Sequence, residues 1–106
     1  MESRKRYILS ARQAPGQLTV DEGAANALRR GASLLPVGLT AVSGSFDRGD
    51  TVRVALPAGA EIARGIVNYD SQDLVRIVGC PSDEIEPILG YHFGDEVIHR
   101  NDLVLL

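Results

Sequence analysis

Three glycines lie among apolar residues in the stretch 37–52, VGLTAVSGSFDRGDTV, a composition that could form a phosphate-binding loop. Such a loop follows the pattern G-x-x-x-x-G-K-[S/T] between a strand and a helix. Here five residues separate Gly38 from Gly44, and Ser45 stands where the pattern needs lysine. Without that lysine no side-chain cation reaches the phosphates, and both flanks are strand-like. The pattern therefore favours turns between strands, with a tight turn at 47–50, over a nucleotide loop.

Two histidines, His92 and His99, flank Asp95 and Glu96, and all four side chains are of types that ligate divalent metal ions. The segment between the histidines is expected to run from a loop into a strand, so the two imidazoles need not face one point. A third strong ligand is also missing. The sequence therefore predicts histidines on the surface or in turns, and no metal site.

The single cysteine, Cys80, is a nucleophile by type, but the negative charges of Asp83 and Glu84 oppose formation of its thiolate. No serine stands in the pattern G-x-S-x-G, and no pair of carboxylates has a recognisable catalytic frame. We therefore predict no catalytic residue in this chain. One cysteine cannot form an internal disulfide, which fits a reducing, cytoplasmic compartment.

Arg29 and Arg30 stand at the end of a predicted helix. Cations are favoured there because the helix dipole is negative at its C-terminus, which is one explanation for the pair. Contact with the phosphates of RNA is the other. The charge distribution bears on this choice: residues 1–31 hold six basic and three acidic side chains, whereas residues 32–106 hold five and eleven. Affinity for polyanions is therefore expected in the N-terminal third, while the net charge of −3 argues against a strong general nucleic-acid binder.

These residues must be positioned by a small fold, because 106 residues with 44% hydrophobic side chains are typical of one globular domain. We expect no membrane span, since no apolar run approaches about 20 residues. Alternating apolar residues and turn signals predict six strands, at 6–11, 39–43, 51–56, 61–69, 96–99 and 103–106. Residues 57–60, PAGA, are expected to form a hairpin turn between two of them.

Three helices are predicted from capping signals, at 22–30, at about 71–78 and, very short, at 83–89. Asp21, then Asp70 or Ser71, and then Ser82 are the expected N-caps, while Gly31, Gly79 and Gly90 are expected to end the helices. Pro87 is expected to kink the third helix or shift its start. Residues 33–38, around Pro36, are expected to be extended. Strands and helices do not alternate regularly, so the predicted class is mainly β: a small mixed barrel or curled sheet with short peripheral helices.

Nearly the whole chain carries a family resemblance. The stretch GASLLPVGLTAVSGSFDRGDTVRVALPAGAEIARGIVNY resembles the PUA domain, a pseudo-barrel of mixed strands that is attached to many RNA-modifying enzymes. Together with GQLTVDEGAANALRRG, YDSQDLVRIVG, SDEIEPILGY and DEVIHRNDLVLL, it is similar to the C-terminal PUA domain of bacterial glutamate 5-kinases, and residues 69–106 are the specific part. The resemblance implies that residues 1–6 lead in from a preceding kinase domain and that residues 7–106 form the PUA domain, with Met1 near the junction.

The resemblance also implies a function. Glutamate 5-kinases transfer the γ-phosphoryl group of ATP, with Mg²⁺, to the γ-carboxylate of glutamate, the first step of proline biosynthesis. Their catalytic and nucleotide sites lie in an amino-acid-kinase domain outside this chain, so no catalytic residue, metal ligand or cofactor is implied here. The expected role is a cytoplasmic regulatory or assembly module whose partner is that kinase domain, with homo-oligomerisation left open.

Two alternatives stand beside this role. PUA domains that bind RNA use the first helix and the glycine-containing loop after it, which implies Arg29, Arg30, Gly31 and Ser33 as RNA-binding residues. A stand-alone protein with its own partner is the other alternative, and the coding sequence upstream of Met1 would decide it.

Overall fold

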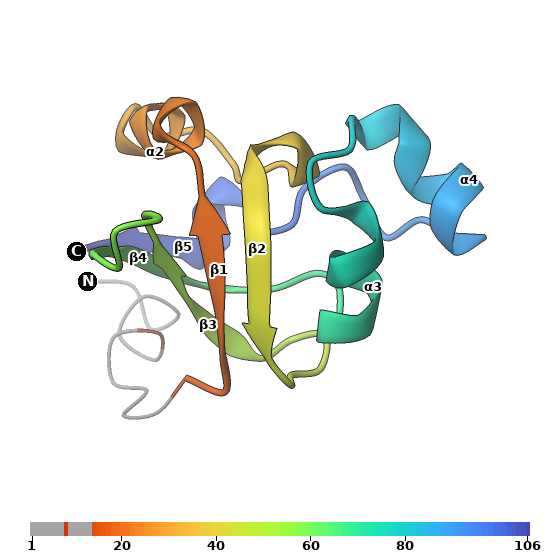
Figure 1. Ribbon diagram of the computed structural model, residues 1–106, viewed down its shortest axis with the longest axis horizontal. Coiled ribbons are helices and arrows are strands. Elements are labelled where there is room, and N and C mark those ends of the chain that lie inside the picture. Colours follow the sequence, from red (N-terminus) through yellow and green to blue (C-terminus); the bar gives the residue numbers. More distant parts are fainter. Residues whose placement is uncertain (1–7, 9–13) are drawn as a thin grey trace.

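Five strands form one mixed sheet in the computed structural model, which describes residues 8 and 14–106 (Figure 1). The strand order is β2-β1-β3-β4-β5. β1 runs parallel to β3, and the other neighbouring pairs are antiparallel. The predicted class of mixed strands with peripheral helices is therefore confirmed. The strands are β1 (Gly16–Val20), β2 (Leu39–Gly44), β3 (Thr51–Ala55), β4 (Glu61–Ile66) and β5 (Leu103–Leu105).

β1 is the strand that sequence analysis missed, although it lies inside the sheet between β2 and β3. Its first residue, Gly16, belongs to the Pro-Gly pair, and the residues after it lead into the first helix, so the local sequence favours a turn and not a strand. In the structure Leu18 pairs with Val42 on one side and Val54 on the other, and it is fully buried. Because both neighbours are distant in sequence, pairing makes this short segment a strand.

The first helix, α2 (Glu22–Arg29), begins and ends close to the predicted residues. The Asp21 carboxylate accepts a hydrogen bond from the Ala24 amide at 2.7 Å, which is the N-cap contact expected from the sequence. Ala25 and Leu28 are the buried residues of the helix. The helix therefore packs through one narrow apolar face and leaves its C-terminal arginines exposed.

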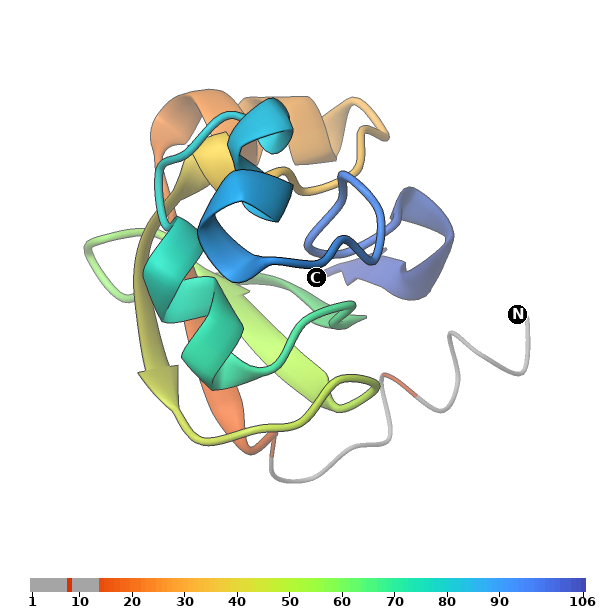
Figure 2. The same ribbon diagram turned by 90° about the vertical axis from the view of Figure 1, so that its right-hand side faces the viewer.

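Two further helices lie on one side of the sheet, where Figure 2 shows α3 and α4 facing the viewer. α3 (Ser71–Ile77) is capped by Asp70, which accepts from the Asp73 amide at 2.8 Å. Next come the 3-10 helix η2 (Ser82–Glu84) and α4 (Ile85–Leu89). Pro87 shifts the start of the α-helix rather than kinking it: it lies in the first turn of α4, where backbone amides need no helical acceptor. Ser82 was wrongly predicted as the cap, because it is the first residue of η2 and Glu84 occupies the N-cap position of α4.

Other expectations near the C-terminus need correction. Residues 96–99 are not a strand: Ile98 makes a single bridge to Leu34, and the chain then enters the 3-10 helix η3 (Arg100–Asp102). The predicted strand at 61–69 ends at Ile66. Residues 33–38 are not wholly extended either, because Pro36 begins the 3-10 helix η1 (Pro36–Gly38), a position that requires no amide donor.

The N-terminal expectations fall mostly outside the described residues. Of the predicted strand at 6–11 the structure describes one residue, Ile8, which is helical and fully buried. The boundary between a lead-in at 1–6 and a domain at 7–106 stays a prediction. Among the residues that the structure does describe, the helices are all too short or too polar to cross a membrane.

The core joins the sheet to the helices. Leu18, Val54 and Ala63 occupy one row across β1, β3 and β4, and each is fully buried. Leu74 and Ile77 of α3 pack into the same cluster. The chain after α4 also contributes, through Val97 and Ile98. The C-terminal tail, which we define as residues 90–106, is therefore part of the fold and not an appendage.

Candidate functional site

Arg29 and Arg30, the predicted RNA contacts, lie at the exposed C-terminal end of α2. One Arg29 guanidinium nitrogen donates to the side-chain oxygen of Asn26 at 3.2 Å, one turn back on the same helix. Arg30 is the C-cap residue, and its amide donates to the carbonyls of Asn26 and Ala27. Both side chains therefore stand where the helix dipole favours a cation, and both are accessible to a polyanion.

Gly31 and Ser33, the other two predicted contacts, differ from each other in the structure. Gly31 has a φ of +91°, a left-handed conformation that strongly favours glycine, and it is exposed. The Ser33 hydroxyl accepts a hydrogen bond from the Arg100 amide at 2.8 Å and so ties this loop to η3. Arg29, Arg30 and Gly31 are thus consecutive on an exposed surface, whereas Ser33 is already engaged by the fold.

A groove that sequence analysis did not predict runs beside α2 and has a volume of about 260 Å³. Leu35 and Val37, on either side of Pro36, are 39% and 55% exposed at this groove. Its charged side chain is Asp21, and the two arginines are not among its lining residues. The first helix and the following loop therefore present an apolar groove with basic residues beyond it, which suits a planar or apolar group better than a phosphate. The sequence signal was the run LLPV in a loop.

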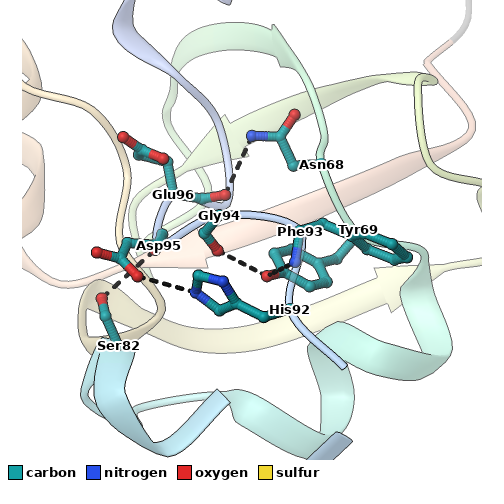
Figure 3. Close-up of polar contacts among 8 residues, drawn as sticks. All are labelled: Asn68, Tyr69, Ser82, His92, Phe93, Gly94, Asp95 and Glu96. Atoms are coloured by element: carbon teal, nitrogen blue, oxygen red, sulfur yellow. Dashed lines mark hydrogen bonds and ion pairs between the residues drawn. The ribbon is translucent and has the colours of Figure 1, made fainter. Parts of the chain in front are cut away.

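A second cluster joins the tail to the body of the domain, and Figure 3 shows its polar contacts. The buried Tyr69 hydroxyl donates to the Gly94 carbonyl at 2.6 Å and accepts from the Phe93 amide at 2.9 Å. Burial raises the pKa of Tyr69, although the Phe93 amide bond acts in the opposite direction. One hydroxyl group thus bonds to backbone groups of two consecutive residues of the tail.

Aromatic rings surround this anchor. The Phe93 ring centroid lies 5.6 Å from that of Tyr69 and 5.1 Å from that of Tyr91, distances typical of interacting rings. The guanidinium carbon of Arg48 lies 3.9 Å from the Phe93 centroid, a cation–π contact. The Tyr91 hydroxyl donates to the carboxylate of Asp73 at 2.5 Å, and this bond raises the pKa of Tyr91 to about 12. Sequence analysis missed this cluster because its members come from three separated segments.

The histidines make local contacts. His92 Nε2 lies 2.9 Å from a carboxylate oxygen of Asp95 (Figure 3), and His99 Nδ1 accepts from the Asn101 amide at 3.0 Å. Glu96 meets Asn68 through its backbone carbonyl. In the described part of the chain, no group of three or more His, Cys, Asp or Glu residues is close enough to hold a metal ion. These contacts agree with histidines in turns.

The glycine-rich stretch forms the predicted turns, and Gly38 also permits a close contact between elements. Gly44 and Gly49 have φ values of +84° and +94°. At 47–50 the Asp50 amide donates to the Asp47 carbonyl at 3.1 Å, which closes the turn. A Cβ on Gly38 would lie 2.6 Å from the Ala24 Cβ, so this glycine lets β2 and η1 approach α2. Cys80 is half-buried in the turn after α3, and its amide donates to the Ile77 carbonyl.

Comparison with known proteins matches residues 16–89 to the PUA domain family. In alignments 107 positions long, the chain is 52% identical to a glutamate 5-kinase of Shewanella amazonensis and 53% identical to one of Deinococcus radiodurans. These alignments cover all of this chain but 28% and 29% of the two kinases. The chain therefore spans less than a third of the curated relatives it matches.

A solved structure supports the same assignment. A PUA domain of Aeropyrum pernix K1, crystallised with tartrate, superposes with a TM-score of 0.60 at 30% sequence identity. The superposition covers 80% of this chain and 41% of that one. The tail, residues 90–106, lies beyond the PUA family match but inside the alignments with the kinases.

Proposed function

Because this chain belongs to the PUA domain family, we propose that it is the non-catalytic PUA module of a glutamate 5-kinase. Its role is to regulate or assemble the amino-acid-kinase domain of the same polypeptide, in the cytoplasm. The observation that carries the proposal is the alignment with the kinases over the whole chain, including the tail that the general family match leaves out.

On this proposal catalysis belongs to the kinase domain, and the PUA module has no catalytic role. The candidate nucleophile Cys80 sits in a turn, and His92 and His99 each satisfy a local contact. Under the same proposal phosphoryl transfer, ATP and Mg²⁺ belong to the kinase domain, and proline biosynthesis is the pathway this module would serve. The PUA module contributes surfaces that bind other parts of the protein or other molecules.

The test is deletion in the full-length protein. Removal of the segment equivalent to residues 14–106 is expected to leave phosphoryl transfer from ATP to glutamate measurable. It is expected to change either the inhibition by proline or the oligomeric state, measured by steady-state kinetics and by light scattering. A deletion variant that matches the full-length protein in both properties would reject the regulatory and assembly role.

RNA binding is the second candidate function, and the exposed Arg29–Arg30 pair beside an apolar groove is the observation that favours it. If it is correct, replacing both arginines by alanine weakens binding of transfer RNA several-fold at low salt and lowers the salt dependence, since fewer counterions are released. Arg53→Ala, an exposed arginine on β3, is the matched control and should bind like the parent. If the parent protein retains no transfer RNA at low salt, RNA binding is rejected.

A further inference from the structure

Tyr91 and Phe93 expose large aromatic surfaces, with 39% and 40% of each residue accessible to solvent. We call these two residues, together with Arg48, the tail aromatic face. Aromatic and arginine side chains are enriched at the centres of protein–protein interfaces, where they contribute most of the binding energy. The two rings are also in contact, so their exposed surfaces form one continuous aromatic patch.

The tail aromatic face is held in a fixed conformation. Phe93 is fixed by its amide bond to the Tyr69 hydroxyl, and its ring carries Arg48 at 3.9 Å. Tyr91 is fixed by its hydroxyl bond to Asp73, whose side chain is buried on α3. A surface whose side chains are already ordered loses little conformational entropy when a partner binds. The face is therefore preorganised for contact.

Three carboxylates and two guanidinium groups lie around the face, and one of the carboxylates, that of Asp95, is 2.9 Å from His92 Nε2. Asp70 and Asp73 lie close enough to Tyr91 to act on its hydroxyl, and Asp95 lies close enough to act on that of Tyr69. The Asp95 side chain is 64% exposed beside the face. Arg48 and Arg76 are the neighbouring cations. Acidic groups next to exposed aromatic rings repel nucleic-acid phosphates and attract a surface that carries lysine or arginine.

The position of the face in the sequence indicates which protein supplies that surface. Both rings belong to the tail, which lies outside the general PUA match and inside the alignments with the kinases. Those kinases are more than three times as long as this chain. On the proposed function, the rest of such a polypeptide is a permanent neighbour at high effective concentration, so even a small contact would be populated.

We propose that the tail aromatic face binds a basic surface on the part of the polypeptide that lies outside these 106 residues. The inference rests on the proposed function, since it requires that the chain is one part of a longer kinase. It assigns to Tyr91 and Phe93 the contact through which the module reaches the kinase domain. The groove beside α2 stays available for a different ligand.

Photo-crosslinking in the full-length protein tests this contact. The photoreactive residue p-benzoylphenylalanine replaces Tyr91 in one variant and Val37, on the α2 groove, in the matched control. The substitution keeps an aromatic ring at position 91 but removes the hydroxyl bond to Asp73. We expect the Tyr91 variant to form adducts with peptides outside these 106 residues, in a yield at least about fivefold above that of the Val37 variant.

Three results would overturn the proposal: adducts confined to these 106 residues, whether within one chain or between two copies; adducts with co-purified RNA; or equal yields from both positions. Asp95→Lys, added to the Tyr91 variant, is expected to lower the adduct yield several-fold, while Glu22→Lys on α2 leaves it unchanged. A yield that Asp95→Lys does not lower contradicts the basic character of the partner surface. Thermal unfolding of each variant checks that it is folded.

This experiment can fail independently of the proposed function. Suppose that the full-length Tyr91 variant forms the adducts, while deletion of the module leaves proline inhibition and oligomeric state unchanged. The docking contact would then stand, and the regulatory role would be rejected. A protein that shows the regulatory effect without the adducts would retain the function and place the contact elsewhere.

Discussion

The end of α2 and the tail aromatic face are both exposed, yet they are built in opposite ways. The α2 end combines adjacent arginines, a left-handed glycine and an apolar groove, and its capping and turn bonds are local in sequence. The tail aromatic face depends on bonds between distant segments, such as Tyr69 to Gly94 and Asp73 to Tyr91, and is bordered by carboxylates. One small domain therefore presents two surfaces with different electrostatic preferences, and we expect each to bind a different class of partner.

The largest expected contrast is in stability. Tyr69→Ala removes a fully buried ring together with the hydroxyl that fixes the tail, and it should lower the free energy of unfolding by roughly 3 kcal/mol or more. Val37→Ala, on the exposed groove, should change it by less than about 0.5 kcal/mol. Urea denaturation followed by circular dichroism measures both. Equal losses for the two variants would show that the tail is not anchored through Tyr69.

Two glycine-to-alanine substitutions, one inside α2 and one just after it, are expected to change stability in opposite directions. Gly31→Ala forces alanine into a left-handed conformation and should cost about 1–2 kcal/mol, although its Cβ would stand in open space among the described residues. Gly23→Ala, inside α2, should instead stabilise the protein by up to about 1 kcal/mol because alanine is the better helix former. Thermal unfolding of both variants is the measurement. Destabilisation of similar size at the two positions would contradict this reading of the loop.

The smallest expected effect is the pH dependence of the tail contact. The pKa of Tyr91 is raised from 10.0 to about 12 because its hydroxyl donates to Asp73, so the folded state favours the protonated phenol. The stability that this preference provides is complete below pH 10 and is lost as the pH rises through 12. Tyr91→Phe should therefore lose less stability than the parent between pH 10 and 12. Identical slopes in urea titrations over that range would contradict the assigned hydrogen bond.

Features encoded by neighbouring residues were predictable from the sequence. Asp21 and Asp70 cap their helices as expected, and Gly90 ends α4 with a φ of +86°. The hairpin turn at 57–60 also forms, with the Leu56 amide donating to the Ala60 carbonyl. Each of these depends on residues within four positions, and the physical preference is therefore visible in a short window.

Features that depend on distant pairing were not predictable. β1 was missed because its strand character comes from pairing with β2 and β3. The strand expected at 96–99 was wrong. Val97 and Ile98 are buried in the core, but their segment pairs with the rest of the chain through a single bridge, between Ile98 and Leu34. In both cases the hydrophobic pattern indicates that the segment is buried, but it does not indicate whether the segment pairs with another strand.

The same limit applied to the candidate site. Arg29, Arg30 and Gly31 were located correctly at the end of a helix because the helix itself was predictable. The Ser33 hydroxyl accepts from the amide of Arg100, which is 67 residues away, and no local pattern predicts this contact. The tail aromatic face combines Arg48 with Tyr91 and Phe93, and no local pattern joins a turn before β3 to a segment after α4.

Hydrogen–deuterium exchange tests the central claim, that the tail aromatic face meets the rest of the polypeptide while the α2 end stays free. Exchange would be followed by mass spectrometry in the full-length protein and in the 106-residue chain. The account predicts that amides of residues 91–96 exchange more slowly in the full-length protein, whereas those of residues 30–38 exchange at the same rate in both. Slower exchange at 30–38 with no change at 91–96 would contradict it.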